Sequence, residues 1–337
     1  MKRMPNIVFI VLLCAGLLTA CATGVTEQTA TDSDASPQNV NVAAIKGPSS
    51  IGMIKFMDEA DNGEVNTNKF SFEIFATADE IIPKIVQGKI DIAAVPPNLS
   101  AVLFTSTQGE VQVLAIGTLG MMYIVENGNT INSIEDLRGR TIYAGFKGKS
   151  PEYDLSYILN AYGIDPEKDL DIEWKSEHAE SVAALTTSEN AIAALPQPFV
   201  TITQMANKNI RIALDLNQEW DKIQETSEHP SLLITGVVVA RKEFVEQNPG
   251  AVADFLDRYA ASVEYVNSNV NEAAVLVGNY DIFPAAVAQT AIPYCNITFI
   301  EGQEMREKLS GYLSILFEQN PQSVGGALPS DEFYFIR

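Results

Sequence analysis

The sequence predicts an α/β fold made of parallel-rich sheets with helices on both faces. Short runs rich in β-branched residues alternate with stretches of helical periodicity from residue 40 to about residue 240. Strands run into helices through segments rich in Gly, Pro and Ser. The chain has 337 residues, 46% of them hydrophobic, which is enough to build two domains around a large core.

The first part of the chain alternates strand and helix. Ser133 precedes the segment IEDLRG and is expected to cap a short helix there, before a strand at 140–145. The apolar run 111–125 is expected to be extended. The pairs of strand and following helix are expected at 40–46 and 50–60, at 69–76 and 78–88, and at 89–95 and 96–106.

The second part continues this alternation. Ser150 before Pro151 predicts an N-cap with proline at the first helical position, and the helix is expected to close near Gly163. The β-rich and helical segments that follow lie at 169–175, 178–186, 189–195, 196–208, 209–216 and 232–240.

After Arg241 strands are expected nearly to stop. Asn248-Pro249 opens a long helix, and a second helix is expected around 303–319. Each carries one apolar stripe at helical spacing, which is typical of a helix that packs against a sheet. The stripes comprise Val252, Phe255, Leu256, Tyr259, Val263 and Val266, and Met305, Leu309, Tyr312, Leu313, Leu316 and Phe317.

The N-terminus predicts export and a lipid anchor. Lys2 and Arg3 precede an apolar stretch at 7–18, which is too short to cross a bilayer and indicates a signal peptide over residues 1–20. The stretch ends in Leu-Thr-Ala-Cys21, which resembles the bacterial lipobox, so we expect Cys21 to be acylated and to hold the protein outside the cytoplasm on a bacterial membrane. The alternative is an ordinary cleavage site with an incidental cysteine.

Residues 21–39 are expected to form a flexible tether, because Val25 is the only large apolar side chain among Thr, Ser, Asp and Gln. The chain is acidic, with 22 Lys plus Arg against 43 Asp plus Glu and a net charge of -21. This charge argues against a nucleic-acid partner. Three cysteines and two histidines are too few for a disulfide scaffold or a histidine-rich metal site, so no metal or cofactor is expected.

Four loops are expected at the carboxyl ends of strands, at 46–50, 95–98, 145–150 and 195–199. In open α/β sheets ligands bind at this edge, because helix N-terminal N–H groups point there and carry partial positive charge. Any one of these loops is more often only a capped turn. Four such loops together predict a site for a small anion or carbonyl group.

Known catalytic patterns are absent from the sequence. Gly145 to Ser150 ends like a P-loop, but Tyr143 stands where that motif needs glycine, so nucleotide hydrolysis is not expected. There is no G-x-S-x-G motif, and His178 and His229 are expected at the surface. Cys295 is expected to be a buried thiol.

Several segments together resemble the substrate-binding lipoproteins of ABC importers, and more narrowly the NMT1/THI5-like group of thiamine-pyrimidine and nitrate, sulfonate and taurine receptors. The similarity covers residues 40 to 320 and is strongest at D-I-A-A-x-P, at L-P-x-P-F-V and at the Asn-Pro before the long helix. The segments read KGPSSIGM, GKIDIAAVPPNLSAVL, LRGRTIYAGFKGKSPEYDLSYIL, ALPQPFVT and ITGVVVARKEFVEQNPGAVADFL.

The resemblance implies a type II periplasmic-binding fold, in which two α/β lobes joined by two crossover strands close on a ligand. Lobe 1 would comprise 40–119 plus 236–337, and lobe 2 would comprise 120–235. Gly117, Gly120 and Gly236 near the crossovers would either absorb hinge motion or ease strand packing. The implied partners are a membrane permease with its cytoplasmic ATPase, and the protein would act as a monomer.

The resemblance also implies ligand contacts from the strand-end loops and the crossovers. Serine hydroxyls would bind a polar head, Asn and Gln would read donors and acceptors, and apolar side chains would form a wall. The implied contacts are Gly47, Pro48, Ser49, Ser50, Ile51, Pro96, Pro97, Asn98, Gly120, Met121, Lys147, Gly148, Lys149, Ser150, Tyr153, Gln197, Phe199 and Ser231.

The expected solute is a thiamine-pyrimidine-like heterocycle or a small anion such as a sulfonate. Tyr153 and Tyr157 would stack on a flat ring if they face the site, which favours the heterocycle, but they could equally belong to the core. Two other functions stay open, an exported enzyme and a sensor-type binding protein on the same fold. The chain lacks the cysteine-rich motif of the yeast thiamine-precursor synthase of this fold, which argues against an enzyme.

Overall fold

The computed structural model describes residues 37–228 and 230–337, and residues 37–337 form one compact unit. The predicted signal peptide, the lipidation site at Cys21, the tether up to residue 36 and His229 lie outside the described residues. None of the described helices is long and apolar enough to cross a membrane.

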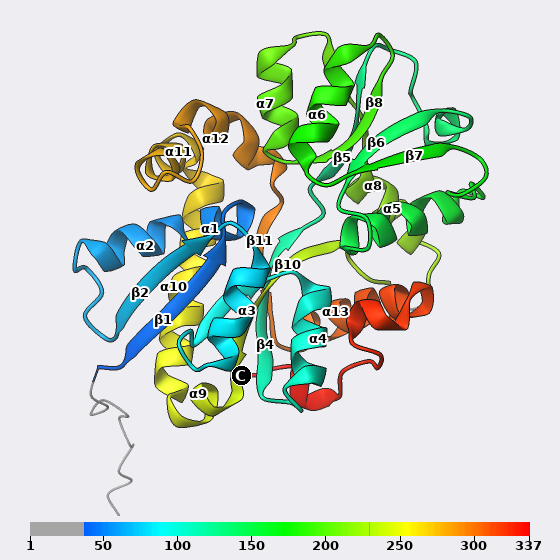
Figure 1. Ribbon diagram of the computed structural model, residues 1–337. Helices are drawn as coiled ribbons and strands as arrows, with labels where there is room; N and C mark the ends of the chain where they lie inside the picture. Colours follow the sequence, from blue (N-terminus) through cyan, green and yellow to red (C-terminus); the bar gives the residue numbers. More distant parts are fainter. Residues whose placement is uncertain (1–36, 229) are drawn as a thin grey trace, which may run out of the picture. The chain divides into compact units, whose positions relative to one another are not determined.

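The strands within the described ranges form two mixed sheets (Figure 1). The first sheet has six strands in the order β11-β4-β10-β3-β1-β2. Strands β2, β1 and β3 are parallel, and β10 lies antiparallel between β3 and β4. The strands are β1 Asn39–Ile45, β2 Lys69–Phe75, β3 Ile92–Val95, β4 Val111–Leu119, β10 Ile234–Arg241 and β11 Ile297–Glu301.

The second sheet has five strands in the order β7-β6-β8-β5-β9 and repeats the arrangement of the first. In this sheet β7, β6 and β8 are parallel, and β5 lies antiparallel beside β8. The chain enters the sheet through β5, which also pairs antiparallel with β9. The strands are β5 Met122–Asn127, β6 Thr141–Gly145, β7 Asp171–Lys175, β8 Ile192–Pro196 and β9 Ile210–Asp215.

Helices cover both faces of the first sheet, as the alternation predicts. Val42 and Ala44 of β1 pack into one apolar cluster, with α1, α2 and α10, whereas Ala43 between them packs into another, with α3, α4 and α13. The helices are α1 Pro48–Gly52, α2 Ile54–Asp61, α3 Ala78–Val86, α4 Pro97–Ser106, α5 Ser150–Ala161, α6 His178–Thr187, α7 Phe199–Ala206, α8 Leu216–Gln224, α9 Lys242–Gln247, α10 Pro249–Ser268, α11 Val270–Asn279, α12 Ala285–Ala291 and α13 Gly302–Gln319, with short 3-10 helices η1 Ile134–Leu137, η2 Ile292–Tyr294, η3 Pro321–Val324 and η4 Asp331–Phe333.

The two apolar stripes are confirmed in α10 and α13. Every stripe residue of α10 is buried, and in α13 all are buried except Phe317, which is partly buried. Helix α10 begins at Pro249 with Asn248 at the N-cap position, so Asn248-Pro249 opens the helix as predicted. The prediction that strands nearly stop after Arg241 missed β11, a five-residue edge strand that pairs with β4.

The chain passes from the first sheet to the second between β4 and β5, and returns between α8 and β10 (Figure 1). Glycines at these passages are closely packed. A Cβ on Gly117 would lie 2.3 Å from the Tyr259 hydroxyl, and a Cβ on Gly120 would lie 2.5 Å from Leu233. A side chain at either position would clash with its neighbours, so close packing is one reason for glycine at these passages.

Candidate functional site

The four predicted loops all join the carboxyl end of a strand to a helix. Those after β1 and β3 lead into α1 and α4 on the first sheet, and those after β6 and β8 lead into α5 and α7 on the second. Each of these helices therefore presents its N-terminal N–H groups at the edge where the strands end. Helices α4 and α5, with 10 and 12 residues, are the longest of the four.

Asn98 and Ser150 bring the two sheets together at this edge. The Ser150 hydroxyl donates a hydrogen bond of 3.3 Å to Oδ1 of Asn98, which is 5% exposed and lies in the first turn of α4. Nδ2 of Asn98 donates to the carbonyl of Ser323 over 3.4 Å. The N-cap residue of α5 is Lys149, and Ser150 is the first residue of the helix. The prediction that Ser150 is the N-cap was therefore wrong by one residue. The Ser150 hydroxyl bonds across to α4 instead of capping its own helix.

The loop after β1 is held by its own serine. Ser50 is fully buried, and its hydroxyl donates to the Gly47 carbonyl at 2.9 Å and accepts from the Gly47 N–H at 3.1 Å. Ile51 lies in the core. Ser49 is partly exposed, and its Oγ lies 3.2 Å from the position of a Cβ on Gly236. Ser49 is therefore the serine of this loop that is available to a ligand.

Prolines and strand ends shape the remaining loops. Pro48 and Pro97 begin α1 and α4 and are buried, while Pro96 before α4 is partly buried. Gly120 is buried and Met121 partly buried at the passage between the sheets.

Gln197 and Phe199 lie where β8 meets α7. The Gln197 side chain is buried, and its Oε1 accepts hydrogen bonds from the N–H and hydroxyl of Thr201. Its backbone N–H donates to the Met121 carbonyl at 3.0 Å, which ties this loop to the passage between the sheets. Phe199 is only partly buried, so its ring can face a ligand.

Three other aromatic or polar candidates are bonded within the protein. The Tyr153 hydroxyl accepts from Asn320, and Tyr157 accepts from Gln224 and packs against Trp220 with ring centroids 4.6 Å apart. The N–H and hydroxyl of Ser231 donate to the same Gln224. Both tyrosines are partly buried and pack against the apolar core, which supports the alternative that they belong to the core.

His178 was missed by the sequence analysis, which expected it at the surface. It opens α6, and its ring lies between Phe146 and Phe199, with ring centroids 4.8 and 5.3 Å away. Its Nδ1 is buried without a hydrogen-bond partner among the described residues, and burial lowers the pKa of the imidazole to about 4. A Cβ on Gly145 would lie 2.8 Å from Nδ1, so glycine there admits the ring. No sequence motif pointed to His178. It does follow the carboxyl end of a strand, β7, as the four predicted loops do.

The loop 146–149 borders a pocket of about 340 Å³ at the ends of β6 and β7. Lys147, Gly148 and Lys149 are exposed. The pocket is lined by Phe146, Lys147, Lys149, Trp174, Lys175 and Ser176.

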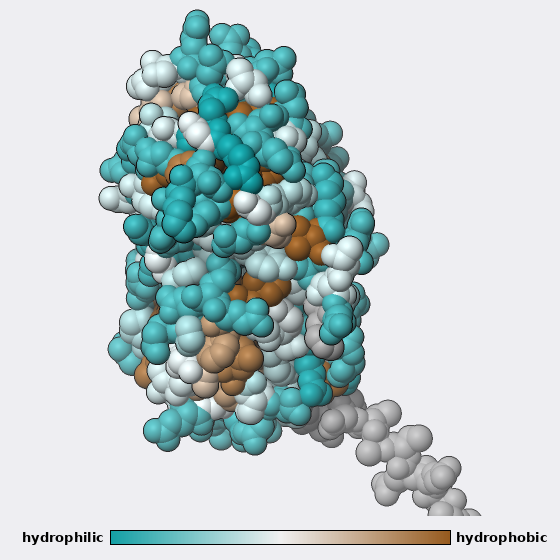
Figure 2. Space-filling view, turned by 90° about the vertical axis from the view of Figure 1, so that its right-hand side faces the viewer, coloured by the Kyte–Doolittle hydropathy of each residue, from teal (hydrophilic) through white to brown (hydrophobic). Residues whose placement is uncertain are grey.

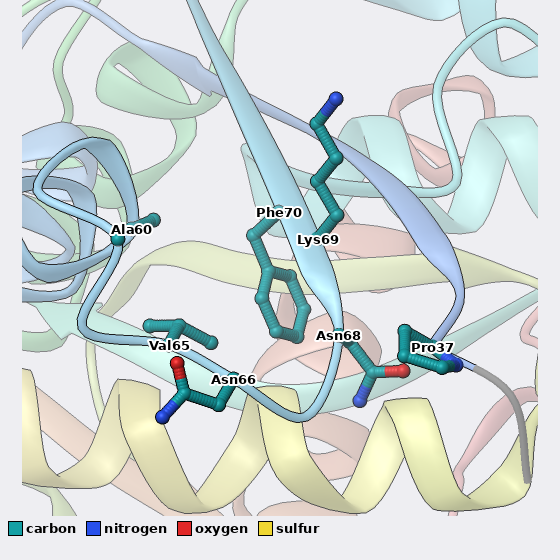
Figure 3. Close-up of a pocket in the computed structure, with 8 residues that line it drawn as sticks. Pro37, Ala60, Val65, Asn66, Asn68, Lys69 and Phe70 are labelled. Atoms are coloured by element: carbon teal, nitrogen blue, oxygen red, sulfur yellow. The ribbon is translucent and has the colours of Figure 1, made fainter.

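A second pocket, of about 330 Å³, lies away from the strand-end loops, beside the edge strand β2 (Figure 3). Figure 3 shows the Phe70 ring turned towards Val65 and Asn66, with Lys69 directed the other way. Its lining comprises Pro37, Ala60, Gly63, Val65, Asn66, Asn68, Lys69 and Phe70, none of which the sequence analysis singled out.

The described residues offer neither a reactive thiol nor a metal site. Cys295 is buried as predicted, and burial raises the pKa of its thiol to about 12, which keeps it protonated and unreactive. Over the described ranges, no group of three or more His, Cys, Asp or Glu side chains is arranged to hold a metal ion. The arrangement at the strand ends is suited to hydrogen bonding with a small polar molecule.

A comparison with models of known protein families identifies a match over most of the chain. Residues 64–269 match the model of a family described as the phosphonate periplasmic substrate-binding protein of ABC transporters. A search of curated proteins finds no significant match.

Solved structures share the fold. An ABC transporter structure from Parabacteroides distasonis has a TM-score of 0.72 at 20% identity, over 88% of this chain and 99% of that one. The periplasmic aliphatic sulphonate binding protein SsuA from Escherichia coli has a TM-score of 0.69 at 17% identity, over 88% and 95%. The ligand-binding component of an ABC-type import system from Staphylococcus aureus has a TM-score of 0.66 at 14% identity, over 89% and 97%. These likenesses confirm the predicted periplasmic-binding fold of two α/β sheets with helices.

Proposed function

The chain belongs to the family of periplasmic phosphonate substrate-binding proteins of ABC transporters, and we propose that it captures a small organic anion between the N-termini of α4 and α5. The family works with a membrane permease and its ATPase. The proposed solute is a sulfonate or phosphonate, because two helix N-termini supply positive potential to an anionic head group. The Ser150–Asn98 contact carries the proposal, since it joins these two helices across the sheets.

The proposed contacts are few. The hydroxyls of Ser49 and Ser150 and the backbone N–H groups of Asn98, Leu99 and Ser150 would donate to the anionic oxygens, because Pro97 and Pro151 have no N–H. Phe199 would lie against the organic part of the solute. The other residues implied by the family resemblance, including Gly47, would shape the loops around it. A single negative charge suits this site better than several, because the protein itself carries -21.

We also propose that the protein is a lipid-anchored monomer of the NMT1/THI5-like subtype. The support is the sequence Leu-Thr-Ala-Cys21 after a short apolar segment, and the order of the motifs named above. Lobe 1 would be 40–119 plus 236–337 and lobe 2 would be 120–235. The grouping of β1 to β4, β10 and β11 in one sheet and of β5 to β9 in the other supports this division, although β10 begins at Ile234, two residues before the proposed boundary.

A thermal-shift panel of alkyl sulfonates, phosphonates, taurine, nitrate and thiamine pyrimidine tests the proposal. A ligand at 100 times its dissociation constant adds about 2.7 kcal/mol of stability, which moves the melting temperature by several degrees. The largest shift should come from a sulfonate or phosphonate. The Ser150→Ala variant should lose most of it, whereas Ser106→Ala, at the exposed far end of α4, should keep it. A shift of the melting temperature with thiamine pyrimidine alone would refute the proposal that the solute is an anion. Equal shifts in the Ser150→Ala and Ser106→Ala variants would refute the proposed position of the site.

A further inference from the structure

The pocket at the ends of β6 and β7 gathers positive charge in an acidic protein. Three of the 22 cationic side chains, Lys147, Lys149 and Lys175, line it, although the chain carries a net charge of -21. Lys147 and Lys149 form no ion pair with any residue in the described ranges. Lys175 pairs with Glu173 at 2.8 Å and lies 5.2 Å from the centroid of the Tyr143 ring. Two ammonium groups are therefore uncompensated, and an anion would relieve their mutual repulsion.

The same pocket has aromatic walls. Trp174 is half-buried and packs against the core, which leaves part of its indole at the pocket. Phe146 is 38% exposed and has a φ of 63°, a left-handed conformation that residues with side chains rarely adopt. Its ring contacts His178 edge to face. Residues held in such conformations are concentrated at ligand-binding and switch regions.

The loop between the walls is held in place by hydrogen bonds. The Phe146 N–H donates to the Lys175 carbonyl at 3.0 Å, and the Lys149 N–H donates to the Phe146 carbonyl at 3.3 Å. The Gly148 N–H donates to the Glu152 carboxylate at 2.5 Å. The walls and the lysine backbones are thus ordered before any ligand arrives, which lowers the entropic cost of binding.

We propose that this pocket binds an aromatic organic anion, an aryl sulfonate or aryl phosphonate. Its ring lies against Phe146 and Trp174, and its anionic group faces Lys147 and Lys149. The ring gains apolar and stacking contacts, and the charge gains two ammonium partners. Neither Ser150 nor Asn98 lines this pocket, so the pocket and the proposed solute site can be tested apart.

Tryptophan fluorescence reports on this pocket directly. The chain has two tryptophans, and Trp220 is fully buried outside the pocket, so Trp174 is the one that a ligand here would quench. Titration of the purified chain with benzenesulfonate should give saturable quenching that weakens with added salt. Methanesulfonate, without a ring, and benzyl alcohol, without a charge, should bind at least about tenfold more weakly, equivalent to about 1.4 kcal/mol.

Charge-matched variants separate the pocket from the general field of the protein. K147Q/K149Q should raise the dissociation constant for benzenesulfonate by about tenfold. K89Q/K208Q removes two exposed lysines at the opposite ends of the strands and should change it by less than about twofold. By calorimetry, Trp174→Leu should bring benzenesulfonate down to the affinity of methanesulfonate.

Three outcomes would overturn the proposal: no saturable quenching in the parent chain, equal losses in the two lysine variants, or equal binding of benzenesulfonate and inorganic phosphate. Saturable quenching without any shift in the thermal panel would support the pocket and refute the proposed function. A shift in the thermal panel without saturable quenching would support the proposed function and refute the pocket.

Discussion

At the scale of single residues, the direction of a hydroxyl decides what a serine can do. Ser50 is fully committed to the Gly47 backbone, whereas Ser49 next to it is partly exposed. Ser150 donates to Asn98 on the other sheet, where an anion with two or three oxygens would compete for it. A charged acceptor forms the stronger bond, so binding of the proposed solute would be coupled to this contact between α4 and α5.

Cys21 carries the first prediction at this scale. If its thiol is acylated, the full-length chain expressed with its own leader should sediment with membranes and require detergent for release. Cys21→Ser removes the acceptor thiol, so the variant should appear in the soluble exported fraction or stay unprocessed. Cys14→Ser, within the apolar segment, is the matched control and should leave the protein on the membrane. Membrane association of C21S equal to that of the parent would contradict the anchor.

The sequence could place candidate residues at strand ends but could not orient them. Gly, Pro and Ser mark loops through local backbone preferences, so all four loops were found. Whether Ser50 faces its own backbone or a ligand depends on neighbours that the local pattern does not contain. His178 was missed for the same reason, because its partial burial comes from Phe146 on the β6–α5 loop and Phe199 at the start of α7.

At the scale of elements, α5 and α13 join the two sheets through a buried acid. The Tyr312 hydroxyl of α13 donates to Oδ1 of Asp154 in α5 at 2.9 Å, and both side chains are buried. Burial raises the pKa of the Asp154 carboxyl from its ordinary 3.8 to about 8, against a smaller opposite effect of the tyrosine hydrogen bond. The native protein therefore holds a proton here that the unfolded chain releases.

This proton makes stability depend on pH. Between about pH 4 and pH 8 the native state binds more protons at Asp154 than the unfolded state, so the free energy of unfolding falls as pH rises, by at most about 1.4 kcal/mol per unit. Asp154→Asn keeps an acceptor for Tyr312 and does not titrate, so its urea unfolding should lose this part of the pH dependence. Asp79→Asn, exposed on α3, should keep it. Identical slopes for D154N and the parent would contradict the buried acid.

Most elements could be predicted because their periodicity is local. The stripes of α10 and α13 and the strands of the parallel sheets follow from spacing alone. The edge strand β11 was missed because it has only five residues, which is too short for the alternation of apolar and polar residues to indicate a strand. The start of α5 differed by one residue because Ser150 bonds to another element.

At the scale of the whole described body, the two sheets share one apolar core. A single cluster includes Ile116 and Val237 of the first sheet, Ile124 and Ile142 of the second, and Leu313 of α13. Figure 2 shows that the face on the side of α5 and α13 is mostly hydrophilic, with small separate apolar patches. The alternation of strands and helices predicted the fold class. It could not predict this core, which depends on how α5, α8 and α13 meet.

A crystal structure of the chain with the solute that stabilises it most tests the central claim directly. We predict density for that solute within hydrogen-bond distance of Ser49 or Ser150, at the N-termini of α4 and α5 and beside Phe199. Its anionic group should point at the two helix N-termini. Density for the solute at the β2 edge pocket, or at the lysine pocket alone, would contradict the claim that the strand-end loops of the two sheets form the solute site.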